Sequence, residues 1–238
     1  MTSPTPSPPT EYSFLTWLER WERLLPATPL VDVVTAPASV AVVSVDLLKG
    51  FSTVGPLSSP RVAHILPTVR TLFEQTYALG VRHFLLIQDT HEEDAIEFDA
   101  FGVHCVAGSE ESEMVDELQS LPFSNLFHVI PKNSISSDLG TGLSAWLDQH
   151  PEVTTFIVVG CCTDLCIYHA AMYLRLRANT LGLRSVRVVV PANAVQTYDL
   201  PVATATELGV LPHDGDLLHR LFLYHIALNG IEVVAQLA

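Results

Sequence analysis

The chain has few basic residues. Its 12 Lys and Arg stand against 26 Asp and Glu, which gives a formal net charge of −14. Nucleic acids and anionic membrane surfaces bind proteins through clustered Lys and Arg. The composition therefore argues against both as partners, and a small neutral or cationic ligand agrees better with this charge.

Long apolar segments and paired cysteines are also missing. No apolar run approaches the roughly 20 residues that span a bilayer. Residues 1–12 contain neither the basic region nor the apolar core of a secretory signal. Of the four cysteines, three lie at 161, 162 and 166, a spacing that suits neither a disulfide framework nor a zinc ribbon. We therefore expect a soluble, cytoplasmic protein with reduced thiols.

What the chain does contain is a regular alternation of apolar runs and helical patterns. Its 238 residues, 48% of them hydrophobic, are enough for one large core. Runs rich in β-branched residues predict strands at 40–45, 83–88, 126–131, 156–160 and 186–191, with a possible edge strand at 231–237. Because these runs are apolar throughout, we expect strands buried on both faces. The predicted fold is α/β, with three αβα layers around a mainly parallel, Rossmann-like sheet.

The N-terminal part gives two further signals. Residues 1–10 are rich in Pro, Ser and Thr, which predicts a mobile tail ahead of a single domain at 11–238. From 11 to 25, aromatic and apolar side chains recur at helical spacing, which predicts an amphipathic helix. This helix packs either on the core, which we favour, or on a neighbouring subunit.

Reactive side chains follow four of the predicted strands. In an open parallel sheet, ligands bind outside the carboxyl ends of the strands. The residues found there are Asp46, the pair Asp89 and His91, Lys132, and Cys166. An acid, a candidate metal-binding pair, a base and a thiol are therefore expected on one rim.

Cys166 is the candidate nucleophile. It lies three residues after Thr163, a good N-cap residue, so its sulfur is expected in the first turn of a helix. There the free N–H groups and the helix dipole favour a thiolate. A lone cysteine is more often a buried structural residue. The presence of Asp46 and Lys132 favours the nucleophile instead, because nucleophilic catalysis needs a base for the thiol proton and a cation beside the thiolate.

A metal site is the second candidate. Asp89 and His91 are separated by one residue at a strand end, so both side chains point the same way. Glu97 and His104 follow on a loop that can bring in two more ligands, a set suited to Zn, Fe or Mn. The alternative is a solvated acidic face, because residues 89–117 hold eleven acidic residues and no Lys or Arg. The spacing of these residues alone favours neither the metal site nor the solvated acidic face.

Five stretches resemble the isochorismatase-like cysteine hydrolases, and within them the plant-type nicotinamidases. These stretches are VVSVDLLKGFSTVGPL (42–57), QDTHEEDAIEFDAFGVHCVAGSEES (88–112), PKNSISS (131–137), VVGCCTDLCIYHAA (158–171) and TYDLP (197–201). They occur in the family's order, and the resemblance covers about residues 38–238.

The resemblance implies roles for particular residues. It implies a catalytic triad of Asp46, Lys132 and Cys166, the same three that the strand ends indicate. It also implies a cis peptide bond between Cys161 and Cys162, and an oxyanion hole formed by the backbone amides of Cys162 and Cys166.

The same resemblance implies a metal and a substrate. The metal ligands would be Asp89, His91, Glu97 and His104, and the ion a divalent metal, Zn first, with Fe or Mn as alternatives. No organic cofactor is required. The metal would hold the pyridine nitrogen of nicotinamide, and Phe51 and Phe101 correspond to aromatics that pack on the substrate ring.

The implied reaction is hydrolysis of nicotinamide to nicotinate and ammonia through a thioester, by an enzyme that associates into homo-oligomers. This chain departs from the family at the pocket wall, where Asp138 and Leu139 replace an aromatic, and Gly102 and Val103 replace two prolines. One alternative is therefore a related hydrolase of another small amide or carbamoyl compound. Another is a non-catalytic binding or oligomerisation protein.

Overall fold

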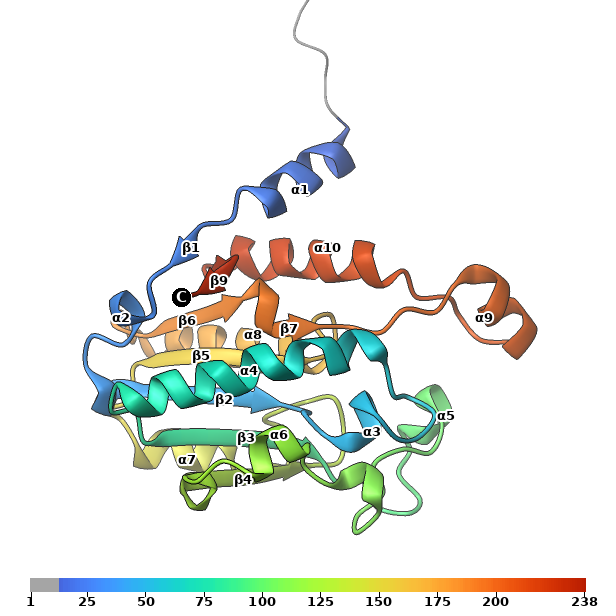
Figure 1. The fold of residues 1–238 in the computed structure, drawn as a ribbon, viewed down its shortest axis with the longest axis horizontal. Coiled ribbons are helices and arrows are strands. Elements are labelled where there is room, and N and C mark those ends of the chain that lie inside the picture. The colour runs from blue at the N-terminus through green and yellow to red at the C-terminus, as the bar shows by residue number, and fades with distance from the viewer. Residues whose placement is uncertain (1–12) are drawn as a thin grey trace, which may run out of the picture.

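A parallel sheet forms the centre of the computed structural model, which describes residues 13–238 (Figure 1). Its strands are β2 (Val40–Val45), β3 (His83–Asp89), β4 (Phe127–Lys132), β5 (Thr155–Cys161), β6 (Arg187–Pro191), β7 (Val195–Gln196) and β8 (Glu232–Val234). They lie in the order β4-β3-β2-β5-β6-β8, with β7 beside β5, and every pair is parallel. The mainly parallel sheet predicted from the apolar runs is confirmed.

The central strands are buried on both faces, as their composition predicts. Every residue of β2 and of β5 is buried. The predicted run 231–237 is divided: β8 forms the edge of the main sheet, and β9 (Gln236–Leu237) pairs with β1 (Ala27–Thr28) in a separate two-stranded sheet. The predicted tail at residues 1–10 lies outside the described residues.

Helices cover both faces of the sheet. They are α1 (Phe14–Arg23), α2 (Leu30–Val33), α3 (Lys49–Ser52), α4 (Pro60–Ala78), α5 (Phe98–Phe101), α6 (Asp116–Gln119), α7 (Leu143–Gln149), α8 (Cys166–Leu181), α9 (Val202–Leu208) and α10 (Gly215–Leu228). Short 3-10 turns occupy Pro37–Ser39, Glu110–Ser112, Ser124–Leu126 and Ala192–Ala194. α4 and α6 pack on one face, and α7, α8 and α10 pack on the other. The three-layer αβα prediction is thus confirmed.

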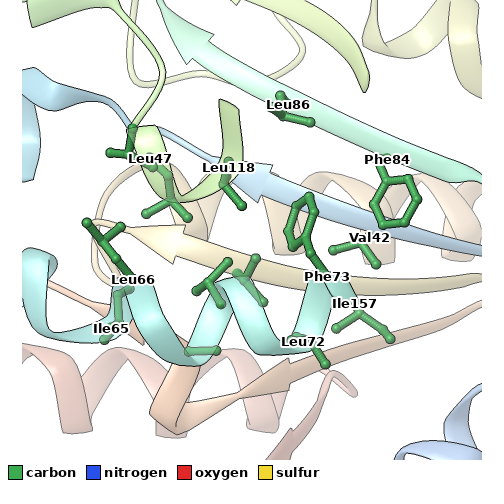
Figure 2. Packing of buried hydrophobic residues seen from close by; sticks show 14 of the residues in the cluster. Val42, Leu47, Ile65, Leu66, Leu72, Phe73, Phe84, Leu86, Leu118 and Ile157 are labelled. Atoms are coloured by element: carbon green, nitrogen blue, oxygen red, sulfur yellow. The ribbon is translucent and has the colours of Figure 1, made fainter. Parts of the chain in front are cut away.

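Side chains from α4 pack against one face of the sheet (Figure 2). Phe73 of α4 stacks on Phe84 of β3 with ring centroids 5.2 Å apart. Val42 and Ile157 lie on the same face, from β2 and β5. Close packing of this kind leaves a helix little freedom to shift, so the strand ends beneath it are held in place.

The N-terminal helix lies outside the three layers, beside α10 (Figure 1). Leu18 is its only fully buried residue. The ring of Tyr224 on α10 contacts Trp17 and Trp21, and Arg220 donates to Glu22 at 2.6 Å. The predicted amphipathic helix is present, and it packs on the edge of the core. No helix within residues 13–238 is both long and apolar enough to cross a membrane.

The carboxyl ends of the central strands lie next to one another. Asp89 and Lys132 are register partners at the ends of β3 and β4. Gly160 of β5 has φ 122°, and a Cβ at this position would lie 2.0 Å from Val45 O. Only glycine therefore allows β5 to approach the end of β2 so closely. This approach brings the residues after β5 next to those after β2.

Candidate active site

Asp46 follows β2 and is almost completely buried. Its backbone has φ 51°, in the left-handed region that non-glycine residues rarely adopt outside functional sites. Its Oδ1 accepts a hydrogen bond from Asp89 N at 2.8 Å. Burial, and then the charge of Asp89, raise the pKa of Asp46 to about 6, although Lys132 acts in the opposite direction. A carboxylate with this pKa is well matched to accept a proton near neutral pH.

Lys132 lies between two carboxylates and the thiol. Its Nζ is 2.9 Å from Asp46 Oδ2 and 3.5 Å from Cys166 Sγ, and it also bonds Asp89 Oδ1. Burial disfavours the charged lysine, but the neighbouring anionic groups, Asp46 first, outweigh it and hold the pKa of Lys132 well above its ordinary value. At Asp89 burial acts to raise the pKa, but the lysine charge, together with the hydrogen bonds from His91 and Lys132, keeps the pKa of Asp89 below its ordinary value. Lys132 is therefore a permanent cation beside the sulfur.

Cys166 is buried and begins α8. Burial, and then the charge of Asp46, raise the pKa of Cys166 well above its ordinary value, while Lys132 lowers it. The surroundings of Cys166 thus act against the thiolate that its place at the helix start favours, because a buried site with two carboxylates disfavours another negative charge. One carboxylate oxygen each of Asp46 and Asp89 and the Cys166 sulfur lie within 4.8 Å of one another. The thiol and the two carboxylates are therefore neighbours in one buried cluster.

The turn before Cys166 differs from the prediction. Thr163 is not the N-cap of α8, because the residue before the helix is Leu165, which makes no side-chain capping bond. The Thr163 hydroxyl instead bonds His219 Nδ1 at 2.8 Å. The peptide bond between Cys161 and Cys162 is cis. Within the described chain, the backbone N–H groups of Cys162 and Cys166 have no hydrogen-bond acceptor.

Two imidazoles and a carboxylate converge beside this cluster. Nε2 of His91 and Nε2 of His104 are 3.1 Å apart, and oxygens of Asp89 lie 3.5 and 3.9 Å from them. The other ring nitrogens meet acceptors: His91 Nδ1 is 3.0 Å from Asn133 Oδ1, and His104 Nδ1 is 2.8 Å from Gly102 O. When both Nδ1 atoms carry hydrogen, two nitrogen lone pairs face each other, an arrangement that a shared cation relieves. The three residues therefore fit a divalent metal of the Zn, Fe or Mn class.

Glu97 lies outside this group of three. Its Oε2 accepts from Ile135 N at 3.0 Å, which ties the segment after β3 to the loop after β4. Phe51 packs edge-on against His104, with centroids 5.7 Å apart. Phe98 contacts the rings of both His91 and His104, whereas Phe101 makes no such contact.

Sequence reasoning missed Phe98 and Asn133. A period of two or three residues along a loop does not show which aromatic will face the histidines. Asn133 could have been found from one feature of the sequence: it directly follows Lys132, at the predicted rim of the sheet.

Replacing Asn133 with Ala is expected to weaken metal binding. The amide oxygen of Asn133 holds His91 Nδ1 and also accepts from Glu92 N at 3.3 Å, so it orients the ring of this candidate ligand. Loss of such an outer-shell partner typically lowers metal affinity about 10–100-fold. Competition of the purified protein with a chromophoric chelator for zinc measures this. Asn125→Ala, at an exposed site, is the control, and equal zinc affinity of the Asn133 variant and wild type would show that Asn133 does not orient His91.

His219, the partner of Thr163, makes stability depend on pH. Burial lowers the pKa of His219 from 6.5 to about 4, while Glu22 and Asp164 act against this and Arg61 acts with it. The unfolded chain then binds a proton before the folded chain does, so stability is present above pH 6.5 and is lost as pH falls towards 4.

We expect His219 to reduce the free energy of unfolding by up to about 3 kcal/mol across that range. Denaturant unfolding at several pH values, for wild type and His219→Gln, measures the difference between them. A wild-type curve with the same acid slope as the variant would contradict the prediction.

Comparisons with known proteins show which family and fold this chain shares. A family model described as the Isochorismatase domain matches residues 40–208. Nicotinamidase 1 from Arabidopsis thaliana is 28% identical to this chain over 221 residues, which cover 87% of this chain and 89% of that protein.

Solved structures share the fold at low sequence identity. A nicotinamidase from Bacillus subtilis superposes with a TM-score of 0.65 at 20% identity, covering 82% of this chain and 99% of that one. A pyrazinamidase of Pyrococcus horikoshii in complex with zinc gives 0.63 at 22% identity, covering 82% and 98%. N-carbamoylsarcosine amidase from Thermoplasma acidophilum gives 0.61 at 22% identity, covering 82% and 95%.

Proposed function

Because this chain belongs to the isochorismatase family of hydrolases, we propose that it is a cysteine amidohydrolase that converts nicotinamide to nicotinate and ammonia. The observation that carries this proposal is the buried cluster in which Lys132 contacts Asp46, Asp89 and the Cys166 sulfur. A buried acid, cation and thiol in contact are the parts that nucleophilic catalysis needs. The similarity to the Arabidopsis nicotinamidase supports this choice of substrate.

The first half of the reaction forms a thioester. Asp46 takes the proton of Cys166, and the thiolate forms a bond to the carboxamide carbon while Lys132 balances its charge. The carbonyl oxygen becomes an oxyanion, which the free N–H groups of Cys162 and Cys166 hold. Protonated Asp46 then gives its proton to the nitrogen, the C–N bond breaks, and ammonia leaves.

The second half releases the acid. Asp46, again a carboxylate, removes a proton from water, and the resulting hydroxide attacks the thioester carbon. The same two N–H groups hold the second oxyanion until the C–S bond breaks. Cys166 leaves as a thiolate and recovers its proton from Asp46, so the site returns to its resting state.

Asp89, His91 and His104 are the residues that would hold a divalent metal, with zinc first. When bound, such an ion supplies a Lewis acid able to coordinate the ring nitrogen of a pyridine carboxamide. Asn133 and Gly102 orient the two imidazoles. Phe51, which packs on His104, offers a flat apolar face to the substrate ring.

A second candidate substrate is a small carbamoyl compound. The loop after Lys132 lacks an aromatic residue: Asp138 accepts from Ser136 Oγ at 2.9 Å, and Leu139 is largely exposed. This loop thus has polar groups in place of an aromatic side chain, which would stack on the ring of nicotinamide. The fold similarity to an N-carbamoylsarcosine amidase is consistent with this alternative.

Measuring ammonia release from several substrates distinguishes nicotinamide from a carbamoyl compound as the substrate. Purified protein loaded in turn with zinc, iron or manganese is given nicotinamide, benzamide or N-carbamoyl amino acids at equal concentration. We expect nicotinamide to be cleaved with a kcat/KM at least about 10-fold above the others, equivalent to about 1.4 kcal/mol. Benzamide is the matched control, because it lacks only the ring nitrogen. Cleavage of carbamoyl compounds alone would select the second candidate, and no cleavage by metal-loaded protein would overturn both.

A further inference from the structure

The backbone between the two proposed oxyanion donors forms one tight turn. Leu165 N donates to Cys162 O at 3.0 Å, so Thr163 and Asp164 are the central residues of this turn. The N–H of Cys162 precedes the turn, and the N–H of Cys166 follows it. The conformation of the two central residues therefore sets the distance and angle between the donors.

Both central residues are held from outside the turn. Thr163 N donates to Gln196 O at 3.1 Å, and its side chain bonds His219. Asp164 is buried, and its two carboxylate oxygens are bonded separately: Thr197 Oγ1 donates to Oδ1 at 2.6 Å, and His213 Nε2 lies 2.8 Å from Oδ2. These partners are 33 and 49 residues away in sequence.

His213 is itself fixed in position. Its Nδ1 is 3.0 Å from Tyr198 O, and its ring stacks on the Tyr198 ring with centroids 3.8 Å apart. Both ring nitrogens thus face oxygen atoms, which fixes the orientation of the ring. The bond to Asp164 involves a charged carboxylate, and such hydrogen bonds are stronger than neutral ones.

The segment that supplies these partners is anchored to the rest of the fold. Arg61 of α4 donates to Thr197 O and to Gln196 Oε1, each at 3.1 Å. Leu200 and His213 exchange two backbone hydrogen bonds, of 2.7 and 2.9 Å. These bonds join the two ends of the segment 200–213, which contains α9 and lies at the right of Figure 1. The Asp164 partners therefore form a rigid support beside the turn.

We propose that Asp164 is a positioning residue for the oxyanion hole: its carboxylate, held by Thr197 and His213, sets the spacing of the Cys162 and Cys166 N–H groups. The inference rests on the proposed acyl transfer at Cys166, although not on nicotinamide as the substrate. An oxyanion donor stabilises the transition state only when it lies about 2.7–3.1 Å from the developing charge, and loss of one donor typically costs about 10²–10³-fold in rate. A substitution that loosens the turn is expected to cause part of this loss in rate.

Two small reagents distinguish this role from a general structural one. p-Nitrophenyl acetate acylates a thiolate through an oxyanion: the C–S bond forms, the ester C–O bond breaks, and p-nitrophenolate leaves. Iodoacetamide alkylates the same thiolate in one displacement: the C–S bond forms, iodide leaves, and no oxyanion develops. The ratio of the two rates at Cys166, with the labelled residue identified by mass spectrometry, reports on the oxyanion hole separately from the reactivity of the thiol.

Asp164→Asn is expected to lower the acylation rate about 10–100-fold and to leave the alkylation rate within about threefold. Thr197→Val removes one of the two hydrogen-bond partners of Asp164, and it is expected to lower the acylation rate by a smaller factor without changing the alkylation rate. This variant replaces Asp164→Asn in the test if Asp164→Asn does not fold. Asp148→Asn is the matched control, because Asp148 also bonds a residue of α8, Arg177, but on the surface. It is expected to change neither rate.

Three results would overturn the proposal. One is an unchanged acylation rate in folded Asp164→Asn and Thr197→Val. Another is an equal fall of both rates, which would place the effect on the thiol or on the fold as a whole. The third is a wild type that is alkylated but not acylated at Cys166, since the turn would then provide no oxyanion hole. Failure to cleave nicotinamide, with the expected rate ratio retained, would refute the substrate and leave the role of Asp164 standing.

Discussion

Replacing Cys166 with Ala is expected to lower amide hydrolysis by at least about 10⁴-fold, because a missing nucleophile leaves only the effects of binding and the oxyanion hole. The fold is expected to persist. Cys166 opens α8 from a buried position, and alanine occupies less volume and is a good helix former. Ammonia release at saturating substrate, with far-ultraviolet circular dichroism of the same samples, measures both effects.

The matched control for this result is Cys162→Ala. Cys162 is also buried beside the site, but in the proposed mechanism it acts through its backbone N–H group, which alanine retains. Its hydrolysis rate is therefore expected to stay within about threefold of wild type, a barrier change below about 1 kcal/mol. Equal loss in both variants, or substantial activity in Cys166→Ala, would remove Cys166 as the nucleophile.

Replacing Lys132 with Met is expected to destabilise the protein and to abolish most of its activity. The Lys132 ammonium is the cation in contact with the buried carboxylates of Asp46 and Asp89. Removal of one partner of a buried ion pair typically costs about 3–5 kcal/mol, because the remaining charge is left uncompensated. For a chain of this length we expect Tm to fall by roughly 10 °C. Hydrolysis should fall at least about 10²-fold, since no cation remains beside the thiolate.

Two comparisons test the electrostatic reason. Adding Asp46→Asn to Lys132→Met removes one of the two facing carboxylates, so the double variant should recover part of the lost stability without recovering activity. Lys49→Met is the control, because Lys49 also bonds two acidic residues, Glu113 and Asp116, but on the surface, where it should contribute little. A Lys132 variant as stable as the Lys49 variant would show that the cluster does not depend on the lysine charge.

The clustering of the candidate site residues could be predicted from the sequence to a large extent. In a parallel sheet the carboxyl ends of the strands share one edge, so residues that follow separate strands come together wherever the strand order places them side by side. For this reason Asp46, Asp89 and Lys132 were recognisable before their contacts were known. The contact between Asp89 and Lys132 was not, because it depends on the register of β3 with β4.

Loops were less predictable than strand ends. Glu97 bonds Ile135 N, although the family resemblance implied a metal ligand, and the Thr163 hydroxyl bonds His219, although its spacing from Cys166 indicated a helix cap. Both outcomes depend on partners far away in the chain, and local spacing contains no information about such partners.

The sequence by itself determined the parallel sheet and its buried central strands, and it pointed to Cys166 as the candidate nucleophile, because the apolar runs and the residues after them can be read directly from the chain. Only the tertiary structure decided the surroundings of the thiol. Burial, and then the charge of Asp46, raise the pKa of Cys166, whereas its position at a helix N-terminus favours a thiolate. The cost of burying a charge depends on every group packed around it, and that environment exists only in the folded molecule.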